Sequence, residues 1–196
     1  MRNAEFDRET VLRSAMLAFM RKGYSKTSMQ DLTQATGLHP GSIYCAFTNK
    51  RGLMLAALAQ YQQDRSASLQ QIFADPSRPA ANLQTYLNQI VAECLSCDAA
   101  QACLLVKAMN ELAEQDDDIR AVITQNLLDW QLALAKVFAQ AKALKQIVSD
   151  TDDTTLAQYF IMGIYGLRTF AHTHPDAKVL HALADKLYRD VCQTEL

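Results

Sequence analysis

Residues 27–50 read TSMQDLTQATGLHPGSIYCAFTNK, and this stretch predicts two short helices joined by a tight turn. Thr27 begins a Thr-x-x-Gln capping box that Gln30 completes. Gly37 supplies the positive φ of a sharp turn, and Pro40 suits the first turn of the next helix because its missing N–H is not needed there. Such a pair can lay one helix in the major groove of DNA, although any small structural helical hairpin gives the same pattern.

A further helix is expected just before this pair. Residues 8–22 place Leu12, Ala15 and Phe19 at helical spacing, and Gly23 is a natural stop after them. Three helices are therefore expected in the first 50 residues, which is enough for a small helix-turn-helix domain.

The expected last helix of the three, residues 40–47, has two different sides when turned at about 100° per residue. The side expected to pack on the other helices holds Ile43, Ala46 and Phe47. The outer side holds small residues, with Tyr44 at its flank: Gly41, Ser42, Cys45 and Thr48. Small outer residues let a helix approach base edges closely, and Lys50 follows at a position suited to phosphate.

The charge of the chain is distributed unevenly. Residues 1–52 hold eight basic and four acidic side chains, a net +4, while the remainder holds 11 basic and 17 acidic, a net −6. The net charge of −2 alone would argue against a nucleic-acid partner. The basic segment coincides with the three expected helices, so the local balance favours binding of a polyanion there.

Composition and motifs limit the class of protein. A hydrophobic fraction of 49% with only 6 Gly and 4 Pro in 196 residues predicts an all-α protein with a large core. No apolar run is long enough for a membrane span or a signal peptide, and five cysteines fit a reducing compartment, so a cytoplasmic location is expected. No nucleotide-binding or hydrolase motif occurs, so neither enzymatic activity nor a cofactor is expected.

The rest of the chain is expected to be helical throughout. A long helix over residues 51–73 should end near Asp75–Pro76, with Pro79 in the following loop. An apolar stripe predicts the next helix: Leu83, Leu87, Ile90, Val91 and Cys94. The acidic run 116–118 should cap a further helix rather than bind metal. Cys94 and Cys97 form half of a zinc motif with no second half, so no metal site is expected.

Two final helices carry apolar stripes that fit a dimer interface. The first stripe holds Phe160, Gly163, Ile164 and Leu167, and the second holds Val179, Leu183 and Leu187. Gly163 and Gly166 would allow a close approach of helices. The stripes fit an intramolecular core equally well, and the residues alone do not separate the two interpretations.

Residues 37–58, GLHPGSIYCAFTNKRGLMLAAL, resemble the signature of the tetracycline-repressor-like (TetR) family of bacterial transcription regulators. The resemblance rests on one set of residues: Gly37, Gly41, Ser42, Ile43, Tyr44, Phe47, Asn49 and Lys50. Upstream matches extend it over about 45 residues: Phe19, Gly23, Thr27, Asp31 and Leu32. The family implies a DNA-binding domain at 1–50 and a larger helical domain for ligand sensing and dimerisation at 51–196, with about nine helices.

The resemblance also implies which residues meet DNA. Thr27, Ser28 and Gln30 occupy positions that touch phosphates or a base edge. The positions at which bases are read hold His39, Pro40, Gly41 and Ser42. Tyr44 and Lys50 fall where backbone phosphate is contacted. Cys45, Ala46 and Thr48 depart from the usual residues of the family, which leaves the operator sequence open.

The family further implies a repressor that binds a near-palindromic operator as a homodimer through the two C-terminal helices and is released by a small-molecule inducer. Candidate inducer-pocket walls are Met109, Trp130, Phe160 and Tyr165, although plain core is the default for large apolar residues at helical spacing. One branch of the family has a cysteine where this chain has Cys103, with Lys107 one turn away, so a thiol sensor of oxidants or electrophiles is an alternative. A cysteine is also a common small core residue, and ordinary packing of Cys103 is the favoured interpretation. A helical protein-interaction module without a role on DNA is the alternative from another class.

Overall fold

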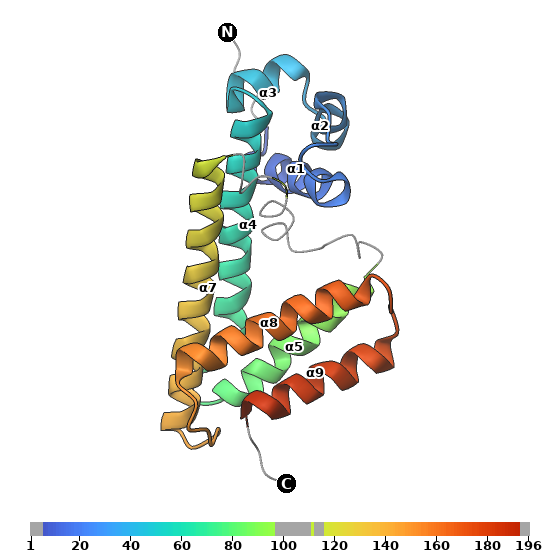
Figure 1. Ribbon diagram of the computed structural model, residues 1–196. Coiled ribbons are helices and arrows are strands. Elements are labelled where there is room, and N and C mark those ends of the chain that lie inside the picture. The colour runs from blue at the N-terminus through green and yellow to red at the C-terminus, as the bar shows by residue number, and fades with distance from the viewer. Residues whose placement is uncertain (1–5, 97–110, 112–115, 193–196) are drawn as a thin grey trace. The chain divides into compact units, whose positions relative to one another are not determined.

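The computed structural model describes residues 6–96, 111 and 116–192. Its described part is all-α, as predicted, and holds eight helices: α1 (Arg8–Lys22), α2 (Met29–Thr36), α3 (Pro40–Phe47), α4 (Lys50–Ile72), α5 (Pro79–Leu95), α7 (Asp117–Ala143), α8 (Asp153–Ala171) and α9 (Ala177–Cys192) (Figure 1). No helix of this described part is both long and apolar enough to span a membrane.

The chain forms two compact units that are not contiguous in sequence. The first unit is Met1–Arg65 with Cys103–Gln125, and the second is Ser66–Ala102 with Asn126–Leu196. The sequence-based boundary after residue 50 remains a prediction, and the compact first unit takes in the first part of α4 and the start of α7.

Helix α1 has the bounds that the sequence predicts. Asp7 caps its first turn by accepting from the N–H groups of Glu9 and Thr10. Gly23 ends it with φ 78°, donating its N–H to the carbonyl of Phe19 at 2.8 Å. The buried side of α1 provides much of the core of the first unit: Val11, Leu12, Ala15, Phe19 and Met20.

The predicted capping box of α2 is wrong by one residue. Ser28, not Thr27, is the N-cap: its hydroxyl accepts from the Asp31 N–H at 3.1 Å, and the Asp31 carboxylate accepts from the Ser28 N–H at 2.8 Å. The Thr27 side chain is fully buried, and its hydroxyl donates to the carbonyl of Gly23 at 2.5 Å. Thr27 therefore closes the turn after α1 instead of starting α2.

The turn between α2 and α3 follows the prediction. Gly37 adopts the left-handed conformation (φ 69°, ψ 5°), and Pro40 stands in the first turn of α3. Leu32 of α2 packs inside with Ile43 and Phe47 of α3, each of them 5% exposed or less. Burial on one side of α3 leaves its other side free to face a partner.

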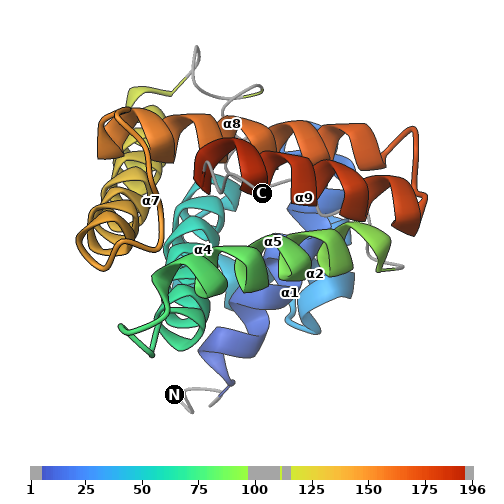
Figure 2. The ribbon, with the colours of Figure 1, turned by 90° about the horizontal axis from the view of Figure 1, so that it is seen from below.

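In the second unit, α5, α8 and α9 lie side by side (Figures 1 and 2). Phe160 of α8 is fully buried there, with ring centroids 6.4 Å from Tyr86 and 5.7 Å from Phe138. Pro79, expected in a loop, instead stands buried in the first turn of α5. A proline is accommodated there because the first turn of a helix needs no N–H from it.

The apolar stripe proposed for a dimer interface is largely intramolecular core. Phe160, Ile164, Leu167 and Leu187 are all buried within the second unit. Gly163 packs closely against Leu187: a Cβ on it would lie 2.4 Å from a methyl carbon of that side chain, which would have to shift. Val179 and Leu183 of the second predicted stripe are nevertheless exposed. Together with the other exposed apolar side chains of α8 they are here called the outer face: Tyr159, Met162, Phe170, Val179 and Leu183.

Candidate nucleic-acid interface

Helix α3 presents the small outer side that the sequence predicts. Gly41, Cys45 and Thr48 are exposed, Ser42 is half-buried, and Tyr44 is 51% exposed. The two residues that open the helix, His39 and Pro40, are exposed as well. The structure thus brings the predicted base-reading residues together at one end of α3, with the Tyr44 hydroxyl group available at the flank.

Two of the three predicted contact residues around the start of α2 are accessible. Ser28 and Gln30 are exposed. The Ser28 hydroxyl already donates to the Asp31 carboxylate at 2.8 Å while capping the helix. Thr27 does not join them, because its buried side chain cannot reach a phosphate. The predicted Thr27 contact is therefore corrected to a role inside the fold.

The junction between α3 and α4 is tightly constrained. Thr48 has a positive φ of 69°, an uncommon conformation for a residue with a Cβ. Asn49 then accepts from the Gly52 N–H with its side chain, at 2.9 Å, and caps α4. A Cβ on Gly52 would lie 2.0 Å from the carbonyl oxygen of Phe47, the last residue of α3. The close approach of these backbones requires glycine at position 52.

Lys50 has partners within the first unit. Its ammonium group lies 4.3 Å from the centroid of the Tyr24 ring, a cation–π contact. Burial lowers the pKa of Lys50, and the nearby Glu111 carboxylate opposes that shift. The predicted contact of Lys50 with phosphate therefore remains a prediction, and it would require the side chain to leave Tyr24.

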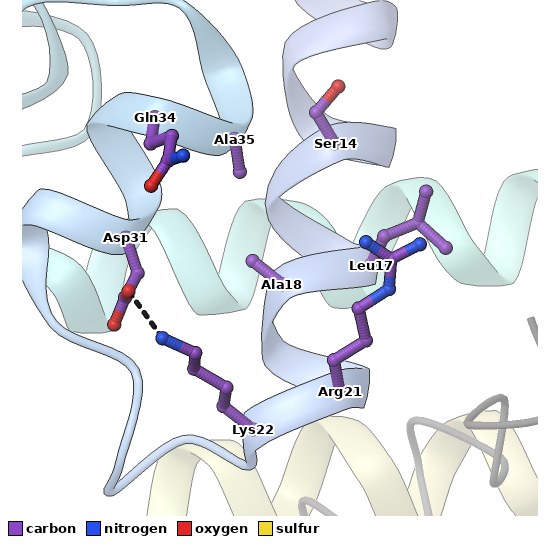
Figure 3. A pocket seen from close by; sticks show the side chains of 8 residues that line it. All are labelled: Ser14, Leu17, Ala18, Arg21, Lys22, Asp31, Gln34 and Ala35. Carbon is purple, nitrogen blue, oxygen red and sulfur yellow. Dashed lines mark hydrogen bonds and ion pairs between the residues drawn. The ribbon is translucent and has the colours of Figure 1, made fainter.

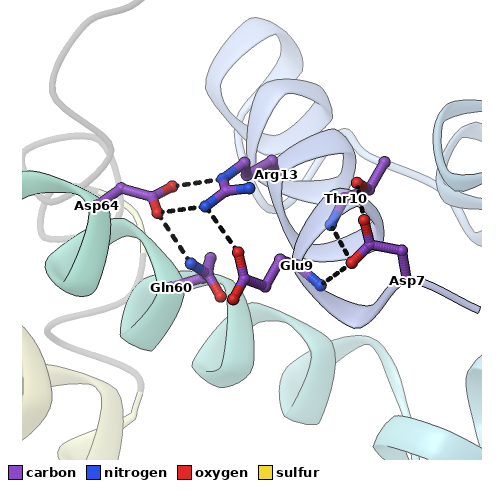
Figure 4. Close-up of polar contacts among 6 residues, drawn as sticks. All are labelled: Asp7, Glu9, Thr10, Arg13, Gln60 and Asp64. Atoms are coloured by element: carbon purple, nitrogen blue, oxygen red, sulfur yellow. Dashed lines mark hydrogen bonds and ion pairs between the residues drawn. The ribbon is translucent and has the colours of Figure 1, made fainter.

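An ion-pair network joins α1 to α4 within the first unit (Figure 4). The Arg13 guanidinium donates to both oxygens of Asp64, at 2.9 and 2.8 Å, and to Glu9 at 3.0 Å. Gln60 also donates to Asp64 at 2.9 Å. These contacts lower the pKa of Asp64, chiefly through its hydrogen bond with Arg13. A bidentate arginine fixes the angle between two helices better than a single contact.

A polar groove runs between α1 and α2 (Figure 3). Its volume is about 330 Å³, and its lining includes Leu17, Arg21 and Gln34. Lys22 and Asp31 pair across it at 2.5 Å, and this contact is the main cause that lowers the pKa of Asp31 to about 2. The pair therefore joins the end of α1 to the first turn of α2.

Two basic residues were absent from the predicted contacts. Lys26 is exposed two residues before the N-cap of α2, where a phosphate is favoured. The Arg8 guanidinium lies 4.8 Å from the centroid of the Phe47 ring, at the end of α3. Both residues belong to the basic segment 1–52 that the sequence analysis identified. Only the fold shows that Lys26 lies just before α2 and that Arg8 lies against the end of α3.

The predicted inducer-pocket residues are not gathered around one described cavity. The Trp130 and Tyr165 rings are 5.8 Å apart, while Phe160 is closely packed in the core. A largely apolar groove of about 280 Å³ is lined by other residues of the second unit: Leu69, Gln70, Phe73, Ala133, Leu134 and Val137. Met109 lies outside the described residues, and so do Cys97 and Cys103.

The described cysteines differ strongly in accessibility. Cys45 is exposed on α3, whereas Cys94 and Cys192 are buried. Burial raises the pKa of Cys94 and raises that of Cys192 to about 11, so both are thiols at neutral pH. Within the described ranges, no group of three or more His, Cys, Asp or Glu side chains could hold a metal ion.

Two family models match this chain, one in its N-terminal part and one in its C-terminal part. Residues 11–57 match the family model "Bacterial regulatory proteins, tetR family", and residues 79–187 match "Tetracyclin repressor-like, C-terminal domain". The HTH-type transcriptional repressor ComR of Escherichia coli (strain K12) is 28% identical over 94% of this chain and 88% of its own length.

Two solved structures resemble the chain along almost its whole length. The regulatory protein TetR from Rhodobacter sphaeroides is 26% identical, with a TM-score of 0.84 over 92% of this chain and 96% of that one. A cysteine mutant of the TetR family regulator CifR, in a crystal with 26-bp operator DNA, is 26% identical, with a TM-score of 0.83 over 96% and 98%.

Proposed function

The chain belongs to the TetR family of helix-turn-helix transcriptional regulators, and we propose that it is a repressor that binds a near-palindromic operator as a homodimer and leaves it when a small molecule binds. The observation that carries the proposal is the exposed, small outer side of α3, held by the close junction at Gly52. A rigidly held helix with a small surface can enter the major groove and approach base edges.

Each accessible residue has a proposed role on DNA. His39, Pro40, Gly41 and Ser42 read bases at the start of α3. The exposed side chains beside them contact phosphates and set the register: Ser28, Gln30 and Tyr44, with Lys26 added from the structure. Lys50 joins this set when its ammonium group exchanges Tyr24 for a phosphate. ComR is named a repressor, which supports repression over activation.

The first prediction concerns the Tyr44 hydroxyl group. The Tyr44→Phe variant is expected to bind a duplex, selected from random DNA by the wild-type protein, about tenfold more weakly, because one hydrogen bond to a charged phosphate is lost. Binding is measured by fluorescence anisotropy at several salt concentrations, and wild-type affinity should fall steeply with salt. Tyr61→Phe removes a hydroxyl group from α4 of the same unit and serves as the matched control. Equal affinity of the two variants would remove Tyr44 from the interface.

The proposed dimer uses the outer face of α8 and α9. Met162 is 59% exposed and Val179 42%, and large apolar side chains grouped in this way mark association surfaces. Gly166 on α8 has open space where a Cβ would stand, so a partner helix could approach closely there. A two-fold dimer through this face would present two α3 helices to two half-sites of an operator.

The second prediction tests that face. Leu183→Asp places a charge on the outer face and is expected to make the protein monomeric at micromolar concentration, because a carboxylate cannot be buried unpaired in an interface. Sedimentation equilibrium measures the mass. Ala139→Asp adds the same charge at an exposed position of α7 and should remain dimeric. A Leu183→Asp protein with unchanged dimer mass would place the interface elsewhere.

For release, two inducer classes remain. A small apolar or amphipathic molecule is favoured by the apolar groove near Phe73 and Val137 and by the Trp130–Tyr165 pair. The second candidate is oxidation of Cys103, supported by the sequence analysis alone because this residue lies outside the described part. An oxidant that releases the wild-type protein from DNA, but not a Cys103→Ser variant, would favour the second candidate.

A further inference from the structure

Arg51, in the first turn of α4, is held by two acids at the start of α7. Its guanidinium donates to the two carboxylate oxygens of Asp116 at 2.5 and 2.8 Å, and to Asp118 at 2.6 Å. Asp116 is simultaneously the cap of α7, accepting from the Ile119 N–H at 3.1 Å. The Arg51 contact lowers the pKa of Asp116 to about 2. The side chain that caps α7 is therefore fixed directly by α4.

A third acid holds the opposite end of the helix-turn-helix. The Glu111 carboxylate accepts from the Ser25 N–H at 3.0 Å, in the turn after α1. It lies so close to Gly23 that a Cβ there would stand 2.1 Å from its oxygen. The Lys50 ammonium, over the Tyr24 ring, is close enough for its pKa to respond to the same carboxylate. Glu111 thus binds the turn after α1 and acts electrostatically on Lys50 at the start of α4, all within the first unit.

Only a short stretch of chain separates these contacts from α3, the proposed recognition helix. Arg51 lies only four residues after Phe47, the last residue of α3. The Asn49 cap and the close contact between the backbones of Gly52 and Phe47 leave this short stretch of chain little conformational freedom. Helix α7 continues from the first unit into the second, where Trp130, Leu134 and Phe138 are buried in the core. The first residues of α7 therefore belong to the same unit as the DNA-binding helices, while the rest of the helix belongs to the second unit.

We propose that Arg51, Asp116 and Glu111 form a clasp that makes the start of α7 move as one body with α3, so that a dimer keeps its two recognition helices at a fixed spacing. This inference rests on the proposed function. Its physical basis is preorganisation: if α3 were free to rotate relative to α7, binding of both half-sites would have to restrict that freedom. The three residues are positioning residues and need not touch DNA.

The test compares one pair of neutral substitutions on two DNA probes. Asp116→Asn retains an oxygen to cap α7 but loses the charge that Arg51 pairs with, while Asp117→Asn removes the same charge from an exposed neighbour that pairs with Arg120. The probes are a full duplex selected by the wild-type protein and the corresponding half-site. Asp116→Asn is expected to bind the full duplex about tenfold more weakly than Asp117→Asn does, with equal half-site affinity.

A double variant separates the clasp from a general loss of structure. Arg51→Gln combined with Asp116→Asn should show nearly the same ratio of full-site to half-site affinity as Asp116→Asn alone, because the Arg51–Asp116 pair is already lost and the pair with the exposed Asp118 contributes little. Melting by circular dichroism confirms that each variant is folded. Equal ratios for Asp116→Asn and Asp117→Asn would overturn the clasp while leaving operator binding intact. A wild-type protein that selects no duplex would overturn the proposed function itself and the clasp with it.

Discussion

Replacing Gly52 with alanine is expected to destabilise the first unit by about 3 kcal/mol and to abolish binding to the selected duplex. Alanine normally stabilises a helix by up to about 1 kcal/mol relative to glycine, so the expected sign is opposite to helix propensity. The reason is the carbonyl oxygen of Phe47, which lies 2.0 Å from the position of the new Cβ. Backbone atoms cannot move aside as a flexible side chain would, so α3 and α4 would have to separate.

Urea unfolding followed by circular dichroism measures this effect. Gly41→Ala is the matched control, because Gly41 is also helical and has no atom within 4 Å of the added Cβ. That variant should unfold at the same or a higher urea concentration than wild type, although its DNA affinity can change because Gly41 is a proposed base reader. If Gly52→Ala were as stable as Gly41→Ala, the junction would not constrain α3.

Replacing Phe160 with alanine is expected to lower the free energy of unfolding by about 3–5 kcal/mol. Phe160 is fully buried between the rings of Tyr86 and Phe138, and its removal would leave a cavity that the surrounding helices cannot fill. The sequence analysis placed Phe160 both on the dimer face and in the wall of an inducer pocket. Its packing instead assigns it to the core of the second unit.

The control for Phe160→Ala is Met162→Ala, two residues away on the same helix. Met162 is 59% exposed, so its truncation should cost the isolated chain little and should instead weaken dimerisation. Urea unfolding at several protein concentrations separates the two effects, because only a dimer contact makes stability depend on concentration. A small loss of stability in Phe160→Ala would contradict its place in the core.

The alternatives from other classes are resolved by the comparisons. The match of residues 11–57 and 79–187 to TetR-family models excludes the helical interaction module without a role on DNA, and the chain is a regulator rather than an enzyme. The net charge of +4 in residues 1–52 had favoured a polyanion as the partner of this segment, despite the negative net charge of the whole chain.

Local chemistry explains why several boundaries were predictable. The predicted bounds of α1 and α3 are confirmed, and Gly23, Gly37 and Pro40 take the positions that their backbone preferences require. The start of α2 was predicted wrongly because Thr27 and Ser28 are both good caps. Only the burial of Thr27 against the carbonyl of Gly23 decides between them.

The sequence by itself determined the helical class, the helix-turn-helix at residues 27–50 and the family, because capping, turn formation and helical spacing act over a few residues. Only the tertiary structure decided that the Phe160 side of α8 is core and that the Met162 side is exposed, since an apolar stripe fits a core and a dimer interface equally well. It alone brought Arg51 to Asp116 and Ser25 to Glu111, pairs separated by 65 and 86 residues. Such pairs leave no local signal, because each residue alone would be an ordinary charged or polar residue on a helix or turn.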